Sequence, residues 1–156
     1  MKHGAALAEK HSPIRETRRL EDQLEAVWKT PSGLIGRLSS VDHKVVGRRY
    51  IATAFFFLCI GGLLAVAMRI QLARPESQLI GPDRYNQLFT MHGTTMMFLF
   101  AVPIFEAVAI FLLPPMLGAR ELPFPRLGAF GFWSFLIGGV FVCGSIFFGA
   151  APKSGW

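Results

Sequence analysis

The chain has 156 residues, of which 52% are hydrophobic and 15 are phenylalanine, with a formal net charge of +6 and a mean hydropathy of +0.42. This composition argues against an ordinary soluble domain. The basic residues flank apolar segments and do not form one patch, so anionic lipid headgroups are better partners than nucleic acid, and no nucleic-acid partner is expected.

A polar segment, residues 1–49, comes first and contains ten Lys or Arg and six Asp or Glu. Ser12 followed by Pro13 has the form of a helix N-cap and first helical residue, and apolar residues then recur at near-helical spacing as far as Trp28. We expect a short amphipathic helix, on the membrane surface or on a partner, that ends at the turn Pro31-Ser32-Gly33. Residues 1–49 are predicted to be an extension outside the membrane, on the cytoplasmic side by the charge argument given below.

A membrane domain is predicted over the remaining residues, 50–156, because three apolar runs follow at about 50–68, 88–113 and 128–151. Even the shortest, 19 residues at ~1.5 Å each, covers about 28 Å, close to the ~30 Å hydrocarbon thickness. In lipid every backbone N–H and C=O must find a partner within the segment, so each run is predicted to be a helix. The predicted fold class is all-α, with three transmembrane helices.

The basic residues also predict an orientation. Arg37, Lys44, Arg48 and Arg49 precede the first span, whereas the arginines of the following loop are accompanied by acidic residues. By the positive-inside rule the N-terminus is expected on the cytoplasmic side. The loop at 69–87 is then external and the loop at 114–127 internal.

Two side chains toward the external side could bind a cofactor. His92 lies within the second span, where a neutral imidazole is either a haem ligand or a group hydrogen-bonded to a neighbouring helix. Arg69 lies at the outer end of the first span, at about the expected depth of His92. It is either an interfacial, snorkelling arginine or a fixed donor to an oxygen at a cofactor's rim.

Two acidic residues lie deeper or on the internal side. Glu106 falls within the second span, where an unpaired carboxylate is costly, so we expect either a proton-relay group or a structural hydrogen bond. Glu121 lies in the internal loop, where by itself it is an ordinary exposed acid.

Several segments taken together resemble subunit I of the haem-copper oxidases, especially the bacterial type in which subunits I and III can be fused. Val41–Tyr50 resembles the Asp-His-Lys segment that leads into helix one, and Asp83–Phe98 resembles the second-helix signature with its histidine. Pro123–Leu127 and Gly155–Trp156 continue the similarity, which covers residues 41–156. The resemblance implies the N-terminal part of a twelve-helix subunit I.

The resemblance also implies roles for single residues. His92 corresponds to an axial ligand of the iron of low-spin haem a, and Arg69 to the arginine that contacts the formyl group of that haem. Glu121 stands in the place of the acid, usually aspartate, at the entrance of a proton-uptake path.

For the whole protein, the resemblance implies a cytochrome c oxidase of the bacterial inner (plasma) membrane. It would take electrons from cytochrome c, reduce oxygen, pump protons and assemble with subunits II and III. The ligands of its high-spin haem and copper would lie in helices that this chain does not contain. Since the chain has one histidine within a span, it is not expected to reduce oxygen alone.

The chain departs from the family pattern at the path entrance. Ile110 and Gly128 stand where asparagines are expected, and neither side chain can hold water by the same hydrogen bonds. Glu106 could then provide an altered route. Two other functions stay open: a quinol-oxidising subunit I, or a non-catalytic membrane anchor or assembly subunit in which His92 is structural.

Overall fold

The computed structural model describes residues 13–28 and 33–154. It divides into two compact units, Met1–Ser40 and Val41–Trp156. All regular structure in the described residues is helical and none of it is strand, so the predicted all-α fold class is confirmed. The expected cap at Ser12 and two residues of the expected turn, Pro31 and Ser32, lie outside the described residues.

The first unit contains helix α2 (Pro13–Trp28) and the short helix α3 (Leu34–Leu38). Helix α2 occupies the segment for which the sequence predicts an amphipathic helix. Leu20 and Leu24, one turn apart, are each 58% exposed on its surface. Whether this face rests on a membrane or on a partner stays a prediction.

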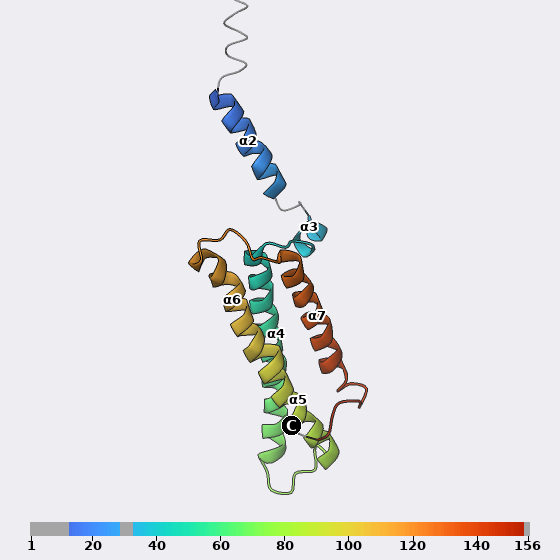
Figure 1. Cartoon of the computed structure of the whole chain (residues 1–156). Helices are drawn as coiled ribbons and strands as arrows, with labels where there is room; N and C mark the ends of the chain where they lie inside the picture. Colours follow the sequence, from blue (N-terminus) through green and yellow to red (C-terminus); the bar gives the residue numbers. More distant parts are fainter. Residues whose placement is uncertain (1–12, 29–32, 155–156) are drawn as a thin grey trace, which may run out of the picture. The chain divides into compact units, whose positions relative to one another are not determined.

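The second unit contains three long helical segments (Figure 1). The first is α4 (His43–Leu72); the second is a continuous run of α5 (Pro82–Thr94), η1 (Thr95–Ala101) and α6 (Val102–Met116); the third is α7 (Pro125–Gly144). All three are long and apolar enough to cross a membrane, as predicted. The first two extend beyond the apolar runs into polar residues, and the third ends before its run does. The membrane boundaries stay a prediction.

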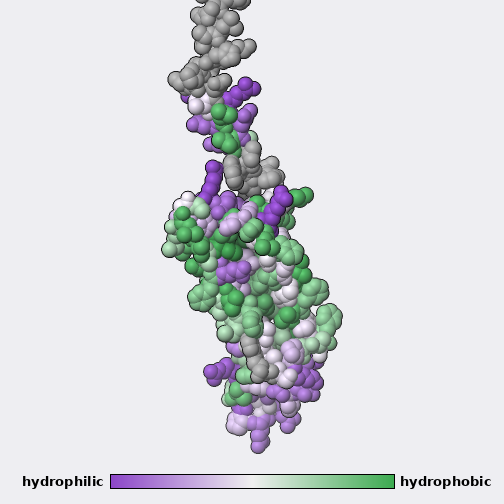
Figure 2. All heavy atoms as spheres, in the orientation of Figure 1, coloured by the Kyte–Doolittle hydropathy of each residue, from purple (hydrophilic) through white to green (hydrophobic). Residues whose placement is uncertain are grey.

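Helix α4 is the central element of this unit, because it packs against α5, η1, α6 and α7 (Figure 1). Its buried residues recur mainly every three or four positions, as one face of a helix requires: His43, Val46, Gly47, Tyr50, Ala54, Phe57, Gly61 and Met68. Hydrophobic side chains cover the middle of the bundle, whereas hydrophilic ones gather at the end that carries the α4–α5 loop (Figure 2). This outward apolar surface suits lipid or further helices.

The π-helical segment η1 interrupts the second long helix and ends at Ala101, two residues before Pro103. A proline inside a helix lacks the N–H that would bond the carbonyl four residues earlier, here that of Leu99, and its ring clashes with that carbonyl. A wider turn relieves this conflict. The local sequence thus accounts for the π-helix, which begins three residues after His92.

Candidate functional site

His92 lies in the last turn of α5 and contacts the backbone of α4. Its Nδ1 is 2.9 Å from the carbonyl oxygen of Gly61. A carbonyl can only accept, so Nδ1 carries the hydrogen and donates it, and Nε2 keeps its lone pair. Metal-binding histidines usually fix their second nitrogen in this way, so the geometry suits a ligand.

Gly61 makes this hydrogen bond possible because it lets the helices approach closely. A Cβ atom at this position would lie 2.7 Å from the sulfur of Met96 in η1. Thr95 of η1, one turn beyond His92 in the sequence, is buried, and its methyl carbon would lie 3.5 Å from the same Cβ atom. The close approach of α4 and η1 at Gly61 therefore accompanies the hydrogen bond that fixes the imidazole.

Arg69 is exposed in the last turn of α4, eight residues beyond Gly61. Along a helix axis this is about 12 Å, so Arg69 and His92 do not share the depth that the sequence suggested. The reason is that α5 begins at Pro82, well before the apolar run, which places His92 more than two turns inside it. Helical side chains lean toward the N-terminus, so Arg69 leans back toward the level of His92.

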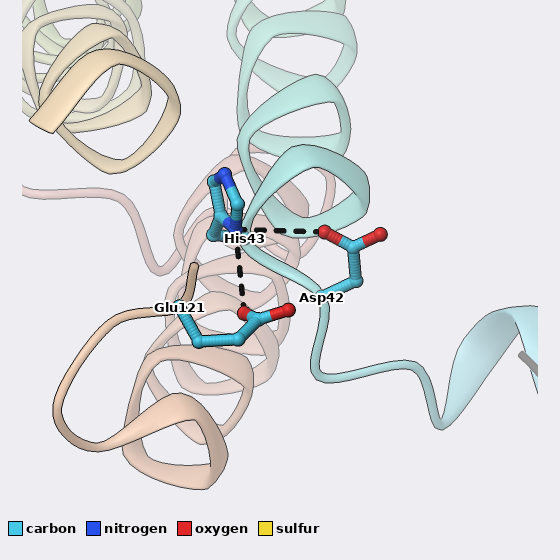
Figure 3. Close-up of side chains that lie close together, drawn as sticks. All are labelled: Asp42, His43 and Glu121. Carbon is cyan, nitrogen blue, oxygen red and sulfur yellow. Dashed lines mark hydrogen bonds and ion pairs between the residues drawn. The ribbon is translucent and has the colours of Figure 1, made fainter. Parts of the chain in front are cut away.

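At the opposite end of α4, three polar side chains come together (Figure 3). Asp42 caps the helix, its Oδ1 accepting a 2.8 Å hydrogen bond from the N–H of Lys44. His43, the first helical residue, is 4% exposed, and its Nδ1 lies 3.3 Å from Oε2 of Glu121. The same nitrogen is 3.7 Å from Oδ1 of Asp42, too long for a hydrogen bond.

The sequence alone predicts no role for His43, which lies in the Asp-His-Lys segment. Its contact with Glu121 joins residues 78 positions apart, which no local pattern reveals. The available signal was a histidine directly at the start of a membrane span. The ligand atoms of Asp42, His43 and Glu121 lie within 4.8 Å of one another, and imidazole and carboxylates are the ligand types that zinc accepts.

Glu106 lies on the exposed face of α6, with its carboxylate near the side chain of Tyr50 in α4. Tyr50 is only 1% exposed, and its ring packs against Phe132 and Phe135 of α7, with centroids 5.2 and 5.4 Å away. The carboxyl group of Glu106 thus lies on the side of α6 that faces Tyr50 of α4. The expected alternatives for this residue, a relay and a structural hydrogen bond, both fit this contact.

The positions that replace the expected asparagines have no polar side chain to offer. Ile110 packs against the core that contains Val46 and Tyr50. At Gly128 a Cβ atom would meet nothing within 4 Å.

Comparison with known proteins places these features in one family. The sequence profile of "Cytochrome C and Quinol oxidase polypeptide I" matches residues 45–156. The chain is 47% identical over 124 residues to a putative cytochrome c oxidase subunit 1-beta of Streptomyces coelicolor, covering 79% of this chain and 22% of that protein. It is 45% identical over 119 residues to cytochrome c oxidase subunit 1 of Bacillus subtilis, covering 76% and 19%. The corresponding subunit of a Synechocystis species is 48% identical over 116 residues, covering 74% and 21%.

Three apolar helices and these bacterial relatives define the class: an integral membrane protein related to oxidase subunits. The chain belongs to the cytochrome c and quinol oxidase polypeptide I family and matches an N-terminal portion of subunit I. It spans about a fifth of the length of the curated relatives that it matches.

Proposed function

We propose that this chain is part of the catalytic subunit of a terminal respiratory oxidase and supplies an axial ligand of low-spin haem a through Nε2 of His92. The observation that carries the proposal is the 2.9 Å hydrogen bond from Nδ1 of His92 to the carbonyl of Gly61. This bond holds the ring in the tautomer and orientation that iron coordination needs. The second axial ligand comes from another part of the oxidase.

Haem a, when bound, supplies one-electron transfer; the chain's own residues hold and tune it. Arg69 serves as the donor to the formyl group at the haem rim. Its planar guanidinium stabilises negative charge there and raises the reduction potential. Arg69 lies about two helical turns along α4 from Gly61, which is the residue that His92 contacts. This separation suits a contact of Arg69 with the haem rim better than one with the iron.

The complete enzyme transfers electrons from cytochrome c to oxygen and couples this to proton pumping, with subunits II and III as partners. Its high-spin haem and copper are bound by ligands outside this chain, and the chain alone reduces no oxygen. We place it in a bacterial inner membrane with the N-terminus and the Glu121 loop on the cytoplasmic side, where protons are taken up. Glu121 is the group at the entrance of that uptake path, and Glu106 a group further along it.

A quinol-oxidising subunit is the second candidate function, because the family description includes both donors. The relatives reported above are named as cytochrome c oxidases, which favours cytochrome c. A non-catalytic anchor is the third candidate, in which the bond between His92 and Gly61 only joins two helices.

Replacing His92 by Ala in the complete oxidase tests the proposal. We expect loss of the low-spin haem absorption, because a metal–ligand bond is removed. A matched histidine control is His43→Gln, which should keep the low-spin spectrum. Arg69→Lys keeps the charge without the planar fork, so haem should stay bound with a shifted band and a lower potential. An intact low-spin spectrum in the alanine variant would favour the anchor.

A further inference from the structure

We propose that a groove between the end of α4 and the α4–α5 loop binds an anionic phospholipid from the membrane leaflet on that side of the bundle. The lipid phosphate lies against the guanidinium of Arg74, and an acyl chain follows the outward face of α4. This inference goes beyond the oxidase function proposed above. It needs only that the three helices span a membrane, so it holds or fails independently of haem binding.

The groove has a volume of about 570 Å³ and combines apolar walls with polar groups. Its apolar lining includes Ile70 and Leu79, which are 56% and 74% exposed. Its polar lining includes Arg74, Ser77 and Gln78. The guanidinium of Arg74 is exposed and forms no ion pair with the described residues. A guanidinium, a hydroxyl and an amide can all donate hydrogen bonds to phosphate oxygens, so the groove suits an anion that also carries an apolar chain.

The loop that forms one side of the groove is held by a side chain of α4. The amide nitrogen Nε2 of Gln71 donates to the carbonyl of Ser77, and Oε1 of Gln71 accepts a 2.8 Å hydrogen bond from the N–H of Ile80. Glu76 has a φ of 58°, a conformation that a residue with a side chain adopts at a cost. The two bonds of Gln71 help to impose this shape on the loop. The groove is therefore formed before a ligand arrives, which lowers the cost of binding.

Below the groove, the outward face of α4 offers a path for an acyl chain. Leu63, Val66 and Ile70 are spaced by three and four residues and are 69%, 54% and 56% exposed. The face of α4 that packs against other helices includes small residues, such as Ala54 and Gly61. Small residues let helices approach closely, as contacts between membrane helices require. The bulky, apolar outward face suits lipid better than a further helix.

The length of this face places Arg74 at the level of the lipid headgroups. Arg48 is exposed near the other end of α4, and the 22 residues from Arg48 to Ile70 cover about 33 Å along the axis and return to within about 40° of the same face. This distance is close to the ~30 Å hydrocarbon thickness. Arg74 follows directly beyond it, at the end of the bundle where hydrophilic side chains gather (Figure 2). A basic residue at this level attracts anionic headgroups.

The test places the photocrosslinking residue benzoylphenylalanine in place of Ile70 in the complete oxidase. The oxidase is reconstituted into vesicles of equal parts phosphatidylglycerol and phosphatidylcholine, and mass spectrometry identifies the adduct after irradiation. We expect phospholipid adducts in which phosphatidylglycerol exceeds phosphatidylcholine by at least about fivefold, the usual effect of one basic residue near anionic lipid. Arg74→Gln should lower this ratio by about fivefold, whereas Arg74→Lys retains the charge and should keep most of it.

The matched control is Arg84→Gln, which removes an exposed arginine of α5 at the same end of the bundle and should leave the ratio unchanged. A crosslink from position 70 to protein would show that another segment covers this face, and would overturn the proposal. Equal capture of the two lipids, or an unchanged ratio in Arg74→Gln, would overturn it as well. The low-spin haem spectrum should stay unchanged in Arg74→Gln, because the haem proposal is tested separately by His92→Ala.

Discussion

Two histidines belong to or contact α4, His43 as its first residue and His92 at Gly61, and they use the same nitrogen in different ways. Both hold a partner through Nδ1: His92 the backbone carbonyl of Gly61, at 2.9 Å, and His43 the carboxylate of Glu121, at 3.3 Å. A backbone carbonyl cannot take up a proton at physiological pH, whereas a carboxylate can. The first partner therefore fixes one tautomer, which suits a metal ligand, and the second can exchange protons with the ring.

The two imidazole rings also differ in how tightly they are packed and in how close they lie to water. His92 contacts the backbone at Gly61, where α4 packs closely against Met96 of η1, within the part of the bundle expected to lie in lipid. His43 lies at the end of a helix, beside a loop residue that water reaches. The partner of each histidine thus determines whether its side chain suits metal binding or proton exchange. Variants of these partners test that difference.

The largest effect is expected at Gly61, although Gly61 itself does not bind haem. In Gly61→Val the new side chain begins 2.7 Å from the sulfur of Met96, and its methyl groups add further volume, so we expect α4 and η1 to move apart and the carbonyl to move away from His92. Loss of the hydrogen bond that orients a metal-binding histidine typically weakens metal affinity by roughly 10–100-fold. The measurement is the low-spin absorption per protein. Gly62→Val is the matched control, because a Cβ at Gly62 meets nothing within 4 Å. Equal spectra in the two variants would contradict a positioning role for the carbonyl.

The next effect concerns the partner of His43. Glu121→Gln keeps a hydrogen-bonding oxygen near Nδ1 but cannot release a proton, so uptake from the internal side should fall by at least about tenfold. Glu121→Asp retains a titratable carboxyl group on a shorter side chain and should recover part of the rate. Proton uptake in vesicles distinguishes these outcomes. Full activity in Glu121→Gln would mean that the carboxylate only positions the imidazole.

The sequence predicts the features of this molecule that composition controls. The helical spans and the position of Glu121 in the loop between the second and third of them follow from apolar runs, because a segment in lipid must satisfy its own backbone. The contact of His92 with Gly61 could not be predicted, because any residue of α4 offers a carbonyl. The pairing of His43 with Glu121 was missed because it depends on how two distant segments pack. The depth of His92 was misjudged because α5 begins in polar residues, which a hydropathy pattern does not count.

A third variant tests whether the close packing at Gly61, beside His92, differs in its effect from close packing elsewhere along α4. A Cβ atom at Gly139 of α7 would lie 2.6 Å from the ring of Phe57. Gly139→Ala should therefore destabilise the bundle by about 1–3 kcal/mol, the usual cost of overpacking, while the low-spin spectrum stays unchanged. Gly138→Ala is the neighbouring control, since nothing lies within 4 Å of its Cβ. The measurement is the free energy of unfolding in detergent. A haem loss in Gly139→Ala would show that the packing of α7 also supports the ligand.

The smallest effect is expected at Asp42, the second carboxylate beside His43. Its Oδ1 accepts the N–H of Lys44 as a helix cap and is 3.7 Å from the imidazole, so its main role is to begin α4. Asparagine caps a helix about as well as aspartate, so Asp42→Asn should change the free energy of unfolding by only a few tenths of a kcal/mol, whereas Asp42→Ala should cost about 0.5–2 kcal/mol. Proton uptake should change less in Asp42→Asn than in Glu121→Gln, because Glu121 is the one of these two carboxylates that is hydrogen-bonded to His43. The opposite order of the two uptake rates would make Asp42 the proton donor and would leave Glu121 as the residue that only holds the loop against α4.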